Sequence, residues 1–323
     1  MRFIDLFCGI GGFRLVLEKR GLNCVFSCDF DPYVAESYKL NFGESPLSDI
    51  TQISENKIPD HEILCAGFPC QPFSMGGLRK GFEDTRGTLF FDILRIIDKK
   101  KPEIIILENV KGLLSHDNKR TFKVMLNKLA SKINGIDAGN NNNLGYNVFY
   151  IVLNARDFGL PQNRERVFIV GFRDQDVSLD LKYQPDNTGK LTSILDKNPE
   201  IKRISKIGKN NIITNLEKHR CYNQIKNLEY LVAYEIRKSR TSFRFDNCSP
   251  CLTTKMGTGG NNVPYLVNHD RFFTIKECLK LQGFDENFQL TSSKSHAYRQ
   301  LGNTISLPVF NFLASRVLDA FKV

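Results

Sequence analysis

Short runs of consecutive apolar residues recur along the first half of the chain, and turn residues follow most of them. Such runs are typical of strands that are buried on both faces. They predict strands at residues 2–7, 24–28, 63–66, 104–107, 146–154 and 167–171, and the end of a short strand at 48–50. Apolar residues at helical spacing predict intervening helices at residues 13–20, 33–41, 84–100 and 119–132. This alternation indicates an α/β fold.

The pattern changes near residue 175. Residues 202–255 contain twelve Lys and Arg against four Asp and Glu, with weak periodicity and frequent Asn, which indicates a small, basic, irregular domain. Thr274 and Glu277 have the spacing of a capping box at the start of a helix. The apolar helix expected at 307–323 resembles the first domain again. We therefore predict a first domain of residues 1–178 and 297–323, and a second of residues 179–296.

Charge and cysteine content narrow the class of protein. The formal net charge of +10 favours a polyanionic partner. The chain shows neither a signal peptide nor an apolar run of membrane-spanning length, so we expect no membrane partner and a cytoplasmic location. The nine cysteines are scattered, which suggests reduced thiols. Cys248-x-x-Cys251 lacks a second pair at a matching distance, so no metal is predicted.

Glycines and carboxylates follow the first predicted strands. Phe7-x-Gly9-x-Gly11-Gly12 is a strand–turn–helix glycine pattern, which lets a backbone approach a nucleoside-bearing ligand. Asp29 ends the second strand, where α/β cofactor domains bind ribose hydroxyls, and Phe30 beside it is suited to stacking on adenine. The alternatives are a helix-capping aspartate and an ordinary core phenylalanine. Asp49 offers a second carboxylate for the adenine amino group.

Reactive side chains follow the next strands. Cys70 lies between two prolines just after the strand at 63–66, as a candidate nucleophile or as a buried turn cysteine. Glu108 follows an apolar strand, where desolvation raises a carboxyl pKa, unless it is a capping or surface glutamate. Arg164 and Arg166 alternate before the strand at 167–171. They are either fixed cations for a phosphate, carboxylate or base oxygen, or a surface pair.

Five motifs in a fixed order make the chain similar to the DNA (cytosine-5) methyltransferases of bacterial restriction–modification systems. They are Phe7-x-Gly9-x-Gly11-Gly12, Gly67-Phe68-Pro69-Cys70-Gln71, Glu108-Asn109-Val110, Gln162-x-Arg164-x-Arg166 and Gly302-Asn303. The resemblance covers almost the whole chain. It implies a Rossmann-like mixed sheet with helices on both faces, as in S-adenosylmethionine-dependent methyltransferases, plus a smaller, irregular target-recognition domain.

The resemblance also implies a reaction. A methyl group would pass from S-adenosylmethionine to C5 of a cytosine flipped out of a short duplex DNA sequence, through a covalent bond between Cys70 and C6. Glu108 would act at the base N3, Arg166 near O2, and Arg164 near the nucleophile or a phosphate. The enzyme would protect host DNA as a monomer in the bacterial cytoplasm, paired functionally with a restriction endonuclease.

Further site residues follow from the resemblance position by position. The cofactor pocket would be lined by Phe7, Gly9, Gly11, Asp29, Phe30, Asp49, Ile50, Leu89 and Asn303. Asp29 and Phe30 depart from the glutamate and tryptophan known at these places in the family. Apart from this transfer, we expect the DNA to contact Gln71, Ser74, Arg240, Arg244, Thr253 and Lys255. The basic residues among them, together with Arg237, would contact either bases or only phosphates.

Two rival functions share these motifs. The first is methylation of cytosine in tRNA, which uses the same chemistry, although the basic segment with its glycine-rich loop favours duplex DNA. The second is a catalytically silent DNA-binding protein that retains the fold. The presence of Cys70 and Glu108 together with Arg164 and Arg166 argues against a silent protein.

Overall fold

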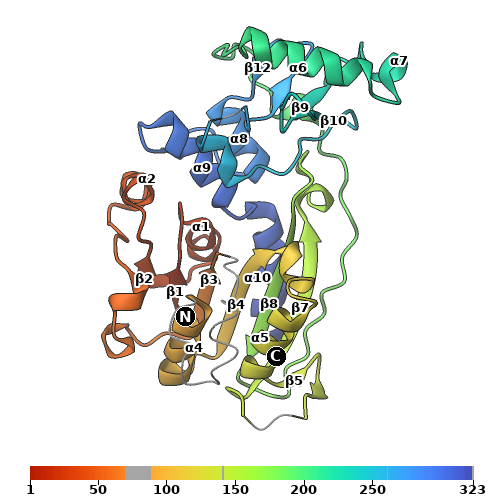
Figure 1. The fold of residues 1–323 in the computed structure, drawn as a ribbon. Coiled ribbons are helices and arrows are strands. Elements are labelled where there is room, and N and C mark those ends of the chain that lie inside the picture. Colours follow the sequence, from red (N-terminus) through yellow and green to blue (C-terminus); the bar gives the residue numbers. More distant parts are fainter. Residues whose placement is uncertain (70–88, 140–141, 260, 322–323) are drawn as a thin grey trace.

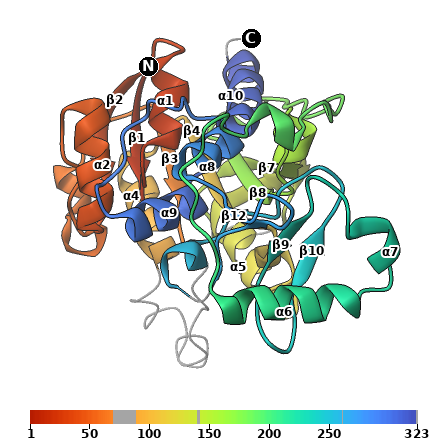
Figure 2. The ribbon, with the colours of Figure 1, turned by 90° about the horizontal axis from the view of Figure 1, so that it is seen from above.

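The computed structural model describes residues 1–69, 89–139, 142–259 and 261–321 of the chain. A large sheet occupies the lower part of Figure 1, and a smaller part containing a second sheet lies above it. Viewed from above, the helix α6 (Lys206–Glu217) and the second sheet extend to one side of the molecule (Figure 2). The two parts are continuous through buried contacts.

The large sheet has eight strands in the order β2-β1-β3-β4-β8-β7-β5-β6. The first four neighbours, β2 to β4, run parallel, whereas β8 is antiparallel to both β4 and β7. This mixed sheet confirms the predicted fold class. The strands are β1 (Arg2–Leu6), β2 (Asn23–Cys28), β3 (Ile63–Gly67), β4 (Ile104–Val110), β5 (Ala130–Ile133), β6 (Ile136–Asp137), β7 (Tyr146–Asn154) and β8 (Glu165–Phe172).

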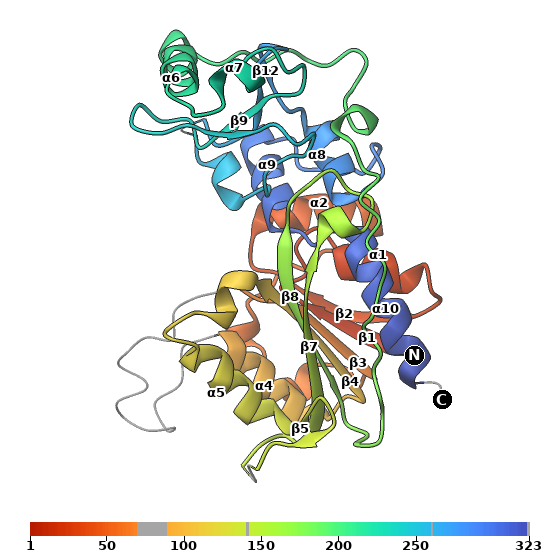
Figure 3. The ribbon, with the colours of Figure 1, turned by 90° about the vertical axis from the view of Figure 1, so that its right-hand side faces the viewer.

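Helices cover both faces of this sheet, with α4 and α5 on one side and α1 and α10 on the other (Figure 3). Alternate residues of one strand enter the two cores. In β4, Ile105 packs toward α4 and α5, whereas Ile106 packs toward α1 and α10. Burial on both faces explains why these strands are continuous apolar runs. The helices are α1 (Gly12–Glu18), α4 (Leu89–Lys100), α5 (Arg120–Leu129) and α10 (Leu307–Phe321), and α2 (Pro32–Phe42) follows β2.

The smaller part holds a four-stranded antiparallel sheet in the order β10-β9-β11-β12, together with α6. Weak periodicity does not predict α6, because it buries only Gly208, Ile212 and Leu216 and leaves Ile207 exposed. The other elements are α7 (Tyr222–Ile225), α8 (Ile275–Gln282), α9 (Lys294–Asn303), β9 (Val232–Tyr234), β10 (Ser242–Arg244), β11 (Tyr265–Leu266) and β12 (Arg271–Phe272).

Two predicted elements are wrong. The helix expected over residues 119–132 ends at Leu129, and Ala130–Ile133 forms β5 because it pairs in parallel with β7. Residues 48–50 do not end a strand. Asp49 instead caps the short 3₁₀ helix η1 (Ile50–Gln52) by accepting a hydrogen bond from the Thr51 amide.

Two other local predictions are confirmed. The capping box of Thr274 and Glu277 starts α8, and α10 returns the chain to the large sheet beside α1. The boundaries at 178/179 and 296/297 stay predictions. None of the described helices is long and apolar enough to span a membrane.

Candidate active site

A cavity of about 730 Å³ lies where the carboxyl ends of β1 to β4 meet the smaller part of the chain. The carboxyl ends of parallel strands are the usual place for ligands in an α/β sheet, and the volume is typical of small-molecule sites. One wall comes from the loops after β1 and β2. The opposite wall comes from residues 252–255, Thr258 and the junction of α9 and α10.

The loop after β1 is held against Asp29 at the end of β2. The Gly9 amide donates to one carboxylate oxygen of Asp29 at 3.0 Å, and the Asp31 amide donates to the other at 3.0 Å. Burial raises the pKa of Asp29, and these two amides oppose that shift. Asp29 thus organises the loop and also faces the cavity.

The glycines of this loop are needed for its shape. Gly9 and Gly11 both have positive φ, and a Cβ at Gly11 would lie 2.7 Å from Cζ of Phe42. Phe7 also has positive φ (56°), which is strained for a phenylalanine. Phe7 and Gly9 line the cavity, whereas Gly11 supports the loop from behind.

The remaining predicted cofactor residues divide into two groups. Phe30, Leu89 and Asn303 line the cavity, and Phe30 is 68% exposed, so its ring is open to a ligand. Asp49 and Ile50 are not among the lining residues. The Asp49 carboxylate accepts hydrogen bonds from the amide and hydroxyl of Thr51, and Ile50 packs in the core.

Glu108 and Arg166 form a pair on the cavity wall. Nε of Arg166 lies 3.0 Å from Oε1 of Glu108, because antiparallel pairing of β4 with β8 places their ends side by side. Burial raises the pKa of Glu108, opposed by the charges of Arg166 and Arg164. The pair therefore places a carboxyl of raised pKa beside a fixed cation.

Asn109 connects this pair to the segment that leads to Cys70. Its Nδ2 donates to the Phe68 carbonyl at 2.9 Å, and its Oδ1 accepts from the Val110 amide at 2.9 Å. The side chain is buried, so the end of β4 fixes the chain just after β3. Pro69 lines the cavity. Cys70, Gln71 and Ser74 lie outside the described residues.

Arg164 is not on the cavity wall. It is buried, and its guanidinium donates to the carbonyls of Leu252 (2.8 Å), Gly302 (3.2 Å) and Thr304 (2.6 Å). Burial, with a smaller contribution from Arg166, lowers the pKa of Arg164 to about 10, so it stays cationic at neutral pH. Arg164 thus joins residues 252–255 to the α9–α10 junction, the two segments of the opposite wall.

Gln162, Gln282 and Ser306 complete this arrangement. The sequence predicts no role for any of them, although Gln162 belongs to one of the five motifs. Gln162 accepts the Leu252 amide (3.0 Å) and donates to the Leu281 carbonyl (2.8 Å). Gln282 donates to the Leu301 carbonyl (2.7 Å) and accepts from the Ser306 hydroxyl (2.8 Å). All three polar side chains are buried, and no local pattern of residues signals such long-range partners.

Some of the residues predicted to contact DNA line the cavity, whereas others are held in ion pairs. Thr253 and Lys255 are exposed and line the cavity. Arg240 makes an exposed ion pair with Glu235 (3.2 Å), and Arg244 is held by Asp246. Among the described residues, no group of three His, Cys, Asp or Glu is placed to hold a metal ion.

Comparisons with known proteins agree with this architecture. The family model described as C-5 cytosine-specific DNA methylase matches residues 1–319. Type II methyltransferase M.HhaI of Haemophilus parahaemolyticus is 38% identical over 98% of this chain and 94% of its own length. Type II methyltransferase M.HaeII of Haemophilus aegyptius is 40% identical over 99% and 93%.

Solved structures share the fold. A crystal structure of the S. pombe Dnmt2 methyltransferase has a TM-score of 0.70 and 19% identity, and covers 100% of this chain and 99% of that one. A crystal structure of a putative DNA modification methyltransferase encoded within a prophage of E. coli has a TM-score of 0.68 and 20% identity, and covers 100% of both chains. At these identities the likeness concerns the fold alone.

Proposed function

Because the chain belongs to the family of C-5 cytosine-specific DNA methylases, we propose that it methylates one cytosine within a short, specific sequence of duplex DNA, using S-adenosylmethionine. The observation that carries this proposal is the pairing of Glu108 with Arg166 on the wall of a cavity that Asp29 and Phe30 also line. One cavity would thus hold the groups for the base and the groups for a nucleoside cofactor.

The residues of the cavity wall formed by the loops after β1 and β2 fit S-adenosylmethionine. Asp29 offers a carboxylate to ribose hydroxyls, the exposed ring of Phe30 offers a face to adenine, and Gly9 leaves the loop without a side chain. When bound, the cofactor supplies an electrophilic methyl group. Phe7, Leu89 and Asn303 would pack around it.

Cys70 and Glu108 would activate the base. The Cys70 thiolate would add to C6 of the cytosine while the Glu108 carboxyl gives a proton to N3, so that C5 becomes enamine-like. C5 would then take the methyl group. Loss of the C5 proton to a base would expel the Cys70 thiolate from C6, and N3 would return its proton to the Glu108 carboxylate. Arg166 would orient Glu108 and donate to the base O2.

A target cytosine must leave the helix to reach this cavity. The atoms of a stacked base are inaccessible to side chains that lie within a pocket, so we propose base flipping. We further propose that the enzyme is a monomer in the bacterial cytoplasm and protects host DNA from a cognate restriction endonuclease. The relatives named above are Type II methyltransferases, which motivates this pairing.

The test is transfer of labelled methyl groups to duplex DNA. We expect transfer by the wild type, none by Cys70→Ser, and a larger loss of kcat than of DNA affinity for Glu108→Gln. Bisulfite sequencing of DNA from cells that express the chain would identify the modified cytosine. Undiminished transfer by Cys70→Ser, or preferential transfer to tRNA in a competition, would refute the proposal.

A further inference from the structure

Two cations at the mouth of the cavity have no acidic partner among the described residues. Lys255 lies in the 3₁₀ helix η7 (Thr254–Gly257), Arg299 lies in α9, and both are exposed residues that line the cavity. Two other cations of the smaller part are engaged, with Arg240 paired to Glu235 and Lys294 to Glu200. Lys255 and Arg299 are the cations of this part that line the cavity, and within the described ranges no carboxylate holds either of them.

The two elements that carry these cations are fixed against each other. A Cβ at Gly257 of η7 would lie 2.9 Å from Cβ of Arg299, and one at Gly302 of α9 would lie 2.6 Å from the Thr254 amide nitrogen. Met256 and Leu301 pack in one core cluster beneath them. Because the backbones are already in contact, a ligand that bridges the two side chains loses only their rotamer freedom and does not have to bring the two elements together.

The charges of the cavity are separated between its wall and its mouth. Asp29 and Glu108 lie on the inner side, whereas Lys255 and Arg299 are exposed at the entrance. Inside the cavity the charge of Arg166 is matched by Glu108, whereas the two cations at the entrance attract an anion. The exposed hydroxyls of Thr253, Thr254 and Thr258 lie on the same wall and add uncharged donors.

We propose that Lys255 and Arg299 form one phosphate-binding ledge, which holds the DNA backbone beside the nucleotide that enters the cavity. This inference rests on the proposed function, and it assigns Arg299 a role in positioning the substrate. Phosphate contacts of this kind fix the register of a protein on DNA without reading its sequence. The ledge would thus set where the flipped nucleotide stands relative to Glu108 and Arg166.

The test is the salt dependence of DNA binding by wild type, Lys255→Gln, Arg299→Gln and the double variant. The probe is a fluorescein-labelled duplex that carries the sequence found by bisulfite sequencing. The slope of log K against log salt changes by about 0.9 for each phosphate contact that is lost. The loss of affinity between 50 and 200 mM NaCl should therefore be about 3.5-fold smaller in each single variant, and about 12-fold smaller in the double variant.

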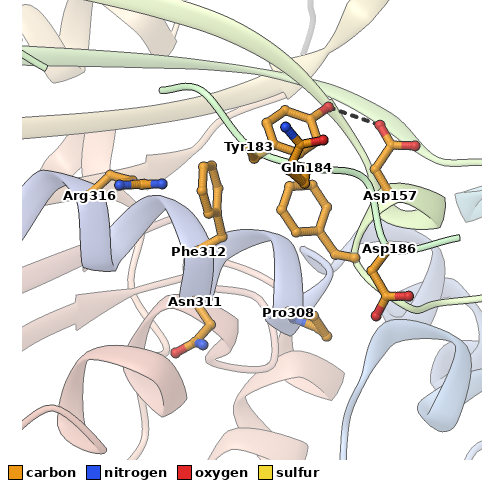
Figure 4. A pocket seen from close by; sticks show the side chains of 9 residues that line it. Asp157, Tyr183, Gln184, Asp186, Pro308, Asn311, Phe312 and Arg316 are labelled. Atoms are coloured by element: carbon orange, nitrogen blue, oxygen red, sulfur yellow. Dashed lines mark hydrogen bonds between the residues drawn. The ribbon is translucent and has the colours of Figure 1, made fainter. Parts of the chain in front are cut away.

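Arg316 supplies a matched control. It lies on α10 in a separate hollow of about 460 Å³ beside Phe312 and Tyr183 (Figure 4), where it donates to the Lys182 carbonyl. Arg316→Gln should keep the wild-type slope, and Arg299→Lys should keep most of it because the charge remains. Circular dichroism and the thermal midpoint establish that each variant is folded.

Two results would overturn the ledge. One is a wild-type slope in the folded double variant. The other is a weaker affinity of Arg299→Gln for S-adenosylmethionine in the absence of DNA with an unchanged DNA slope, which would make the cation a cofactor contact. If the proposed function itself is wrong, the wild type neither methylates nor binds the duplex, and this outcome is distinct from both.

Discussion

Replacement of Arg164 by lysine tests whether this arginine holds the site together or acts on the substrate. The guanidinium makes three hydrogen bonds to buried carbonyls, from Nη1 to Leu252 and from Nη2 to Gly302 and Thr304. A lysine keeps the charge, but its single nitrogen cannot reproduce the fork. Hydrogen bonds from a charged donor contribute about 1.5–3 kcal/mol each, and a buried carbonyl without a partner costs about 1–3 kcal/mol.

If lysine loses two of the three bonds, the free energy of unfolding should fall by about 3–6 kcal/mol. Urea unfolding measures this change, with Arg2→Lys as the control, because the Arg2–Glu62 ion pair is exposed and its variant should stay near wild type. The KM for the cofactor and the KM for DNA should rise together, because Arg164 holds both residues 252–255 and the α9–α10 junction. Unchanged stability with a selective loss of kcat would refute this reasoning and return Arg164 to the substrate.

Two further predictions concern buried carboxyl groups. Burial raises the pKa of Glu108, so the protonated form that would serve the base N3 is lost as pH rises through this raised value, and the methylation rate should fall there. The methylation rate of Glu108→Gln should lack this fall. Identical pH profiles of wild type and variant would contradict the role of Glu108 as the acid at N3. Burial raises the pKa of Asp5 well above its ordinary value, so the native state keeps a proton that the unfolded chain releases near pH 4. The free energy of unfolding should therefore fall above about pH 4, by up to about 1.4 kcal/mol per pH unit, until the native-state pKa is reached. Asp5→Asn should remove this slope in urea unfolding at pH 5 and pH 7, and parallel curves for both proteins would exclude it.

The strands and their chemistry at the sheet edge were predictable because their signals are local. Burial on both faces requires continuous apolar runs, and the residues that follow such runs in parallel strands meet at one edge. Asp29 and Glu108 were found in this way. The capping box of Thr274 and Glu277 is likewise contained in four consecutive residues.

The predictions that failed depend on partners far away in the chain. Ala130–Ile133 continues a helical pattern, but pairing with β7 makes it a strand. Arg164 and Arg166 alternate in sequence, as if both faced one side of a strand. β8 begins only at Glu165, so Arg164 belongs to the preceding loop, yet both guanidiniums contact Sγ of Cys251, Arg164 at 3.5 Å and Arg166 at 3.9 Å. The alternation thus places both cations on one side, and what it does not show is that distant backbone carbonyls bury Arg164 while Arg166 lines the cavity.

The buried polar network shows how one cavity would serve the two ligands of the proposed reaction. Leu252 is held at both backbone polar groups, its amide by Gln162 and its carbonyl by Arg164. The same Arg164 reaches Gly302 and Thr304, which lie next to Asn303. Any shift of residues 252–255 must therefore break bonds to the α9–α10 junction as well. If Asn303 contacts the cofactor as proposed, the protein backbone would position base and methyl donor relative to each other, which is what a reaction between two separately bound molecules requires.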